Sequence, residues 1–146
     1  DSRLARLLDR QEIEDVVYRY CRGIDRCDLE LVRGCYHADA TDHHGSFEGG
    51  VEDYLAWVGE LLSRYSQTMH FVGNILLDWG PREDECAVES YGVALHRSPE
   101  KKAHLNLATG FGISIDSSDE AEPFGLQNAS PYLSGRFGFP KTLGGI

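Results

Sequence analysis

Asp25 and His70 are the two residues of this sequence whose side chains could act together as a general base. A carboxylate within hydrogen-bond reach of an imidazole fixes the tautomer of the ring and raises its basicity, so such a pair can remove a proton near neutral pH. His96 offers a second imidazole that could assist a leaving group. Each residue also has a structural interpretation, because an Asp at a helix end often caps or is solvated, and a strand His often serves packing.

The element that must carry Asp25 is an amphipathic helix. Apolar residues recur at helical spacing from about residue 11 to residue 25 and give this segment one apolar face: Ile13, Val16, Val17, Tyr20, Cys21 and Ile24. Asp25 follows Tyr18 by seven residues and Cys21 by four, so these three form a stripe beside that face. The spacing predicts that Asp25 points into the mouth of a pocket.

The elements that must carry the histidines are strands. Residues 67–80 and 85–98 are rich in β-branched and aromatic residues, and residues 80–84 between them resemble a hairpin connection. We expect residues 102–116 to continue as a third strand. By alternation, His70 shares one side with Val72 and Asn74, and Tyr91 lies on the opposite side from His96 unless a bulge intervenes. The other side of the first strand carries Met69, Phe71 and Ile75.

The remaining segments complete one α+β domain over residues 1–146. A short helix is expected over 29–36 with Asp28 as its cap, residues 38–50 suggest a strand that leads into a Gly-rich turn, and a third helix starts near Val51. Three helices followed by a meander of strands indicate a curved antiparallel sheet wrapped around its own helices, with a pocket between them. A chain of 146 residues is long enough for one core and too short for two ordinary domains.

Composition limits the partners and the location that we expect. The formal net charge of −10 would repel a phosphate backbone, so nucleic acid is not an expected partner. No run of apolar residues is long enough to span a membrane, and the first residues lack the apolar core of a signal peptide, so we expect a cytoplasmic protein with no membrane contact. The four cysteines lack metal or disulfide spacing and are expected to be reduced thiols.

A metal site is the competing use of the histidines and acids. His37, His43 and His44 cluster with Asp39 and Asp42. Adjacent histidines in one strand point to opposite faces, and the spacing matches no zinc pattern. We therefore expect neither a metal nor any other cofactor.

Four motifs resemble those of the SnoaL-like branch of the nuclear transport factor 2-like superfamily. They are QEIEDVVYRYCRGIDRCD at residues 11–28, HADA at 37–40, QTMHFVGN at 67–74 and SYGVALH at 90–96. The similarity extends from about residue 8 to residue 111. It implies a cone-shaped sheet around three N-terminal helices. Edge strands in a cone of this size favour an assembly of two or three identical chains.

The same resemblance implies a site and a reaction. Dehydratases and dehydrochlorinases of this family use an Asp and a His in elimination, and Asp25 and His70 look like that pair. His96 is similar to the second histidine of scytalone dehydratase, and Tyr20 or Tyr91 could polarise a substrate oxygen. We therefore expect a cofactor-independent lyase that acts on a small apolar or cyclic substrate.

Other functions remain open on the same fold. The family also contains cyclases, isomerases and the small subunits of aromatic-ring dioxygenases, so the alternative is a ligand-binding or accessory subunit. Trp57 and Phe71 would then belong to the core or to an interface, although both could also stack on a ligand, and Asn74 is a further candidate for substrate binding.

Residues 112–146 depart from the family pattern. They are rich in Gly, Ser and Pro and close no obvious hairpin, although residues 111–116 alternate as a strand would. Read from the last base of the Gly112 codon, the bases that encode Ile113 to Asn128 allow YIDRFERR, a Gly-rich turn and WIAK or RIAK, which is close to the expected family ending. We hypothesise that a frameshift near Gly112 replaced the original ending, and gene codons that cannot spell this alternative would disprove it.

Overall fold

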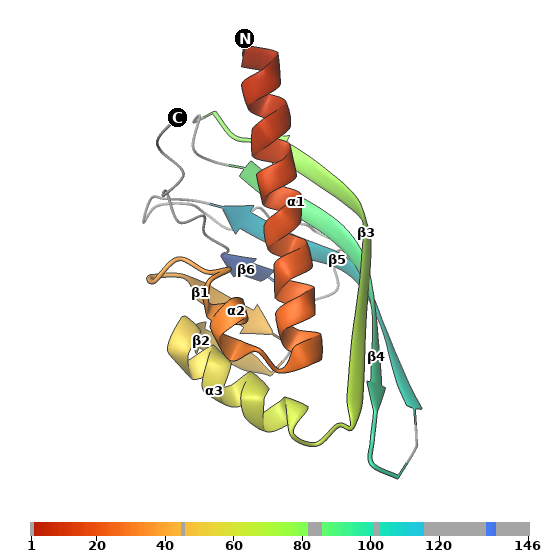
Figure 1. Cartoon of the computed structure of the whole chain (residues 1–146). Coiled ribbons are helices and arrows are strands. Elements are labelled where there is room, and N and C mark those ends of the chain that lie inside the picture. Colours follow the sequence, from red (N-terminus) through yellow and green to blue (C-terminus); the bar gives the residue numbers. More distant parts are fainter. Residues whose placement is uncertain (1, 45, 82–85, 101–102, 116–133, 137–146) are drawn as a thin grey trace.

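The computed structural model describes residues 2–44, 46–81, 86–100, 103–115 and 134–136. Three helices lie on the concave side of one curved sheet (Figure 1). The elements in chain order are α1 (Ser2–Arg26), α2 (Leu29–Arg33), β1 (Thr41–His44), β2 (Phe47–Gly50), α3 (Val51–Leu62), β3 (Gln67–Trp79), β4 (Cys86–Arg97), β5 (Ala103–Ile115) and β6 (Ser134–Arg136).

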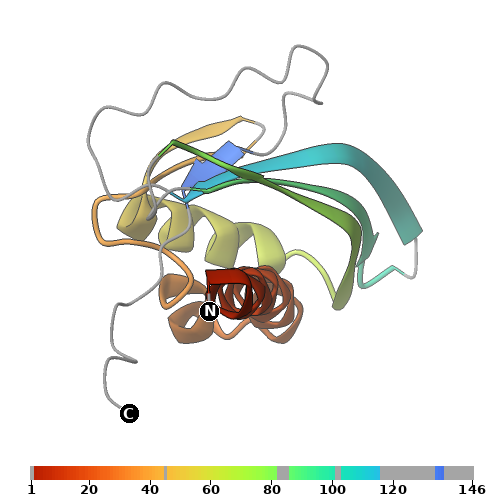
Figure 2. The same cartoon turned by 90° about the horizontal axis from the view of Figure 1, so that it is seen from above.

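The sheet confirms the predicted α+β architecture. Its strand order in the described part of the chain is β2-β1-β6-β5-β4-β3, so β3 is an edge strand. Neighbouring strands are antiparallel except for β5 and β6, which run parallel. Figure 2 looks from above and shows the long strands β3, β4 and β5 arching over α1 and α3. The helices thus fill the hollow of the sheet and place the end of α1 beside β3.

Helix α1 begins earlier than the apolar pattern predicts. It starts at Ser2, whereas that pattern begins near residue 11. Leu4, Leu7 and Leu8 continue the helical spacing, but their side chains are exposed. The early turns of α1 therefore extend beyond the core.

Two other segments differ from the prediction. Helix α2 ends at Arg33, because the amides of Cys35 and Tyr36 bond to carbonyls three residues back and form a tight turn. Residues 47–50 form β2, where we expected a Gly-rich turn. Gly49 and Gly50 stay extended because their backbones pair with β1.

The core lies between the three helices and the inner face of the sheet. Its apolar residues include Ile13, Val16, Val17, Tyr20, Ile24, Val32, Tyr54, Leu55, Val58, Leu62, Cys86 and Val88. These residues confirm the predicted apolar face of α1. The Asp28 carboxylate accepts a hydrogen bond from the backbone amide of Leu31 at 3.0 Å, which confirms the predicted cap of α2.

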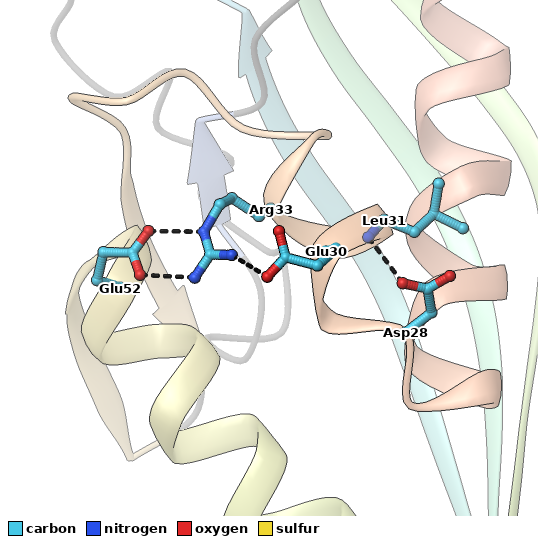
Figure 3. A network of polar contacts seen from close by, with 5 residues as sticks. All are labelled: Asp28, Glu30, Leu31, Arg33 and Glu52. Carbon is cyan, nitrogen blue, oxygen red and sulfur yellow. Dashed lines mark hydrogen bonds and ion pairs between the residues drawn. The ribbon is translucent and has the colours of Figure 1, made fainter.

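A network of charges joins α2 to α3 at the surface (Figure 3). The Arg33 guanidinium donates to both carboxylate oxygens of Glu52, at 2.8 and 2.7 Å, and also to Glu30. The two parallel bonds to one carboxylate fix the orientation of both side chains. This contact helps to hold α3 against the short helix that follows α1.

Gly23 allows α1 and α2 to approach closely. A Cβ atom at this position would lie 2.6 Å from Cγ2 of Val32 and 3.2 Å from the Asp28 carbonyl oxygen. Val32 is fully buried and its branched side chain has little rotamer freedom, so it cannot move away without cost.

We expect Gly23→Ala to destabilise the protein by about 1–3 kcal/mol, because overpacking at the helix crossing outweighs the better helix propensity of Ala. Urea unfolding would measure this change. Gly34→Ala is the matched control, because a Cβ there has no neighbour closer than 3.5 Å. A Gly23→Ala variant as stable as the unaltered protein would contradict the expectation.

A bulge in β3 reverses the alternation of its side chains. The pairing with β4 shifts by one residue between Gly73 and Leu76, and Asn74 has a φ of 51° within this bulge. His70 is partly buried before the bulge and Ile75 is partly buried after it, whereas Asn74 is exposed. The prediction that Asn74 lies on the same side as His70 and Ile75 on the other is therefore wrong.

Parts of the sequence predictions lie outside the described residues. Residues 82–84 of the expected hairpin connection and most of the atypical segment 112–146 are among them, so the frameshift hypothesis stays a prediction. Within that segment, β5 extends to Ile115 as expected, and Ser134–Arg136 forms β6, which no sequence pattern indicated. No helix of the described residues is long and apolar enough to cross a membrane.

Candidate active site

The structure brings Asp25 and His70 into direct contact. Nδ1 of the His70 ring lies 2.7 Å from Oδ1 of Asp25. The backbone amide of His70 donates to Oδ2 of Asp25 at 2.9 Å, and the Thr68 hydroxyl donates to Oδ1 at 3.1 Å. The carboxylate is thus held by three donors, all of which come from β3.

Secondary structure explains how this contact is reached. Asp25 lies in the last turn of α1, and β3 runs along this helix, with His70 as the fourth residue of the strand. Thr68 lies two residues before His70 and so shares its side of the strand. The side chains of Asp25 and His70 are 19% and 15% exposed, so the pair is shielded from bulk solvent and still reachable.

The hydrogen bonds decide the charge of Asp25. Burial alone would raise the pKa of its carboxyl, but the bonds from the ring and amide of His70 and from Thr68 outweigh this effect and lower the pKa below its usual value. Asp25 is therefore ionised at neutral pH. An ionised Asp25 can only accept a hydrogen bond, so in a neutral ring Nδ1 carries the hydrogen and Nε2 is the basic nitrogen.

His96 lies beside His70, as the sequence predicts for a shared site. The two ring centroids are 5.6 Å apart and the rings are nearly perpendicular, at 89°. The His96 ring also contacts Tyr65, whose ring centroid lies 4.8 Å from that of His96. His96 is paired in register with Thr68, which explains why it projects to the same side of the sheet as the pair.

All three predicted catalytic residues line one cavity of about 890 Å³ between the end of α1 and the start of β3. Its described walls also include Tyr18, Cys21, Arg22, Arg26, Met69, Val72, Leu95 and Arg97. Tyr18, Cys21 and Asp25 share this wall, as their helical spacing predicts. Burial raises the pKa of the Cys21 thiol to about 12, with a further contribution from Asp25, so Cys21 is no nucleophile at neutral pH.

Three predicted substrate-binding residues lie away from the cavity. Phe71 is 68% exposed on the outer side of β3, and Tyr91 is exposed on the outer side of β4. Asn74 is exposed in the bulge. Side chains on the outer face of the sheet cannot reach a ligand beside His70, so none of the three belongs to the candidate site.

Tyr20 and Trp57 belong to a buried aromatic cluster. The hydroxyl groups of Tyr20 and Tyr54 are hydrogen-bonded to each other, and burial raises the pKa of Tyr20 well above its usual value. Trp57 stacks on Phe47 with ring centroids 5.4 Å apart. Neither residue is among the described walls of the cavity, so the structure places both in the core.

A sequence comparison identifies the family. Residues 5–117 match the SnoaL-like domain. The chain belongs to this family. The match runs from the first turn of α1 through β5 and so includes every residue of the candidate site. No curated protein matches the chain significantly by sequence.

Solved structures share the cone of this SnoaL-like domain. A hexachlorocyclohexane dehydrochlorinase, LinA-type3 from Novosphingobium barchaimii, is 21% identical with a TM-score of 0.69, and the similarity covers 98% of this chain and 95% of that one. A protein from Novosphingobium aromaticivorans assigned as a scytalone dehydratase is 18% identical with a TM-score of 0.69, over 90% and 80% of the two chains.

A third similar structure is assigned a different role. It is assigned as the β subunit of an aromatic-ring-hydroxylating dioxygenase from N. aromaticivorans, and it is 13% identical with a TM-score of 0.61 over 94% of each chain. At these identities the shared property is the nuclear transport factor 2-like fold.

Sequence reasoning missed several residues of the site in this SnoaL-like domain. Thr68 could have been found from its position two residues before His70. Arg22 and Arg26 lie on the same turns of α1 as Asp25, but arginines on a helix surface are common and carry no signal by themselves. Tyr65 follows α3 and reaches His96 only through the tertiary fold.

Proposed function

We propose that this SnoaL-like domain is a cofactor-independent lyase that eliminates water or a halide from a small, largely apolar substrate. The observation that carries this proposal is the 2.7 Å contact between Asp25 and His70 in a cavity that His96 also lines. A positioned carboxylate and imidazole supply the general base that elimination needs.

The proposed reaction uses each of the three residues once. Nε2 of neutral His70 takes a proton from the substrate carbon next to the leaving group, and the electrons of the broken C–H bond form the new double bond. The leaving group departs with its own bonding electrons, as hydroxide or halide, assisted by His96. Asp25 stabilises the imidazolium that forms on His70, because its carboxylate accepts the hydrogen bond from Nδ1–H throughout.

The first test is a screen for elimination with purified protein. Small cyclic alcohols and chlorides that bear an acidified C–H next to the leaving group would be incubated with the protein, and alkene formation followed by absorbance or mass spectrometry. A product that depends on the protein, and that still forms after chelation, would support the proposal. The absence of any product across both substrate classes would contradict it.

A second function, that of a binding or accessory subunit, draws support from the outer face of the sheet. Large apolar residues on β3 and β4 are exposed there: Met69, Phe71, Leu76, Tyr91 and Leu95. An apolar patch of this kind is typical of an interface. The patch fits the proposed homodimer or homotrimer equally well, because two copies could pack their sheets together.

Sedimentation analysis separates these uses of the outer face. A dimer or trimer of the pure chain would show that identical copies cover the patch and leave the lyase proposal unchanged. A monomer that assembles only with a different protein, and that has no elimination activity, would favour the accessory subunit.

A further inference from the structure

We propose that Arg22, Arg26 and Arg97 form a binding site for an anionic group of the substrate, a carboxylate or a phosphate. This inference builds on the proposed function, because it names the class of molecule that reaches His70. The geometry that points to it is simple. All three arginines line the cavity that contains Asp25 and His70.

Two elements bring the arginines to the cavity. Arg22 and Arg26 are four residues apart near the end of α1, so their side chains are neighbours on one face of the helix. Arg97 is the last residue of β4, and its pairing with Gln67 places it at the start of β3. The proposed site therefore lies where the C-terminal end of α1 meets the C-terminal end of β4.

The guanidinium groups of Arg22 and Arg26 have no hydrogen bond or ion pair among the described residues. Three other arginines of the described chain pair with carboxylates: Arg10 with Glu14, Arg33 with Glu30 and Glu52, and Arg64 with Glu60. Figure 3 shows the Arg33 network. Arg97, the third arginine of the cavity, donates from Nη1 to Oε1 of Gln67 at 3.3 Å. Arg22 and Arg26 thus keep their donors available for a ligand.

The charge of the cavity opposes that of the whole chain. The protein has 24 acidic residues against 14 Lys and Arg, and this excess would repel an anion from most of the surface. The described walls of the cavity instead include three arginines and one carboxylate. That carboxylate, Asp25, already accepts hydrogen bonds from His70 and Thr68. The described walls therefore carry more positive than negative side chains, opposite to the balance of the whole chain.

The other walls suit the rest of such a substrate. Tyr18 and Val72 offer apolar surface for a carbon skeleton. A guanidinium binds the oxygens of a carboxylate or phosphate through parallel hydrogen bonds, which fixes orientation as well as position. An anionic group held by the arginines would decide which carbon of the skeleton faces His70.

Binding of unreactive probes tests the inference without any need for turnover. 2-Naphthoate, 2-naphthyl phosphate and the neutral 2-naphthamide share one ring system and differ in charge. Their binding would be followed by NMR through the imidazole signals of His70 and His96, which line the cavity and so report where the probe binds. The affinities of 2-naphthoate and 2-naphthyl phosphate, compared with each other, show whether the site prefers a carboxylate or a phosphate.

We expect both anions to bind at least about tenfold more tightly than the amide. The double variant Arg22→Gln, Arg26→Gln should weaken anion binding by about fivefold or more and leave amide binding unchanged, since exposed charge pairs are individually weak. The matched control is Arg19→Gln, Arg64→Gln, which removes the same charge outside the described cavity walls and should stay within about twofold of the unaltered protein.

Two results would overturn the inference. The first is that the anions bind no more tightly than the amide to the unaltered protein. The second is that the Arg22→Gln, Arg26→Gln variant keeps its affinity for the anions or loses affinity for all three probes alike. The proposed lyase activity can fail independently, because anion binding as expected with no elimination in any assay would leave this site in place.

Discussion

His70→Ala is expected to lower the rate of elimination by about a hundredfold to ten-thousandfold, because it removes the general base. The C–H proton then has no positioned acceptor, while the cavity and His96 remain. The rate is measured under conditions that separate kcat from KM, and the loss should appear in kcat. A variant that keeps its turnover would remove His70 from the mechanism.

The same variant is expected to stay folded. Asp25 keeps the backbone amide of residue 70 and the Thr68 hydroxyl as donors, so its carboxylate is not left buried without a partner. His43→Ala is the matched control, because His43 is exposed on β1 and is not among the described cavity walls. It should retain full activity, and circular dichroism should show both variants folded.

Asp25→Asn is expected to reduce turnover by about a hundredfold or more, although the shape of the side chain is kept. A neutral amide cannot stabilise the imidazolium that forms on His70, and it can leave the ring in the wrong tautomer. Substrate binding should change little, because Asp25 acts through His70. Asp39→Asn, an exposed acid outside the described cavity walls, is the control and should be fully active.

The stability of the Asp25→Asn variant should depend on pH in a defined direction. Burial raises the pKa of the Asp25 carboxyl, but its hydrogen bonds lower it further, so the folded-state pKa lies below the unfolded value of about 3.9. Asp25 therefore stabilises the fold at any pH above the unfolded value, and this contribution disappears as the pH falls through the folded value.

Urea unfolding at several pH values measures this contribution. At pH 7 the Asn variant should be less stable by about 1–3 kcal/mol, the typical range for a hydrogen-bonded charged group. The difference should narrow as the pH falls below about 4. A difference that stays constant down to pH 3 would mean that the ionised carboxylate does not contribute to stability.

Periodicity was sufficient to predict the helices and the long strands. The apolar spacing from Ile13 to Ile24 marks the buried face of α1, and residues 67–98 have the composition of a strand pair. These signals are local, because each element must bury one face with its own period. The pairing of Asp25 with His70 came from family motifs, since no local pattern links residues 45 positions apart.

Alternation failed where the sheet is irregular. The bulge after Gly73 adds one residue to β3 relative to β4, and so it turns Asn74 outward and Ile75 inward. Neither the bulge nor its effect on later side chains can be read from a regular period of two. The interpretation of Phe71 as a stacking residue failed for a related reason, because only the curvature of the sheet shows which side is hollow.

The sequence by itself determined the α+β class, the family and the residue types that could perform elimination, because these depend on composition, period and local motifs. Only the tertiary structure decided which groups meet. In the folded chain, Asp25 is hydrogen-bonded to His70 and Thr68. Tyr20 is hydrogen-bonded to Tyr54 in the core, and Arg22 and Arg26 line the cavity. Such contacts depend on the packing of α1 against β3, and distant packing leaves no periodic signal in a single chain.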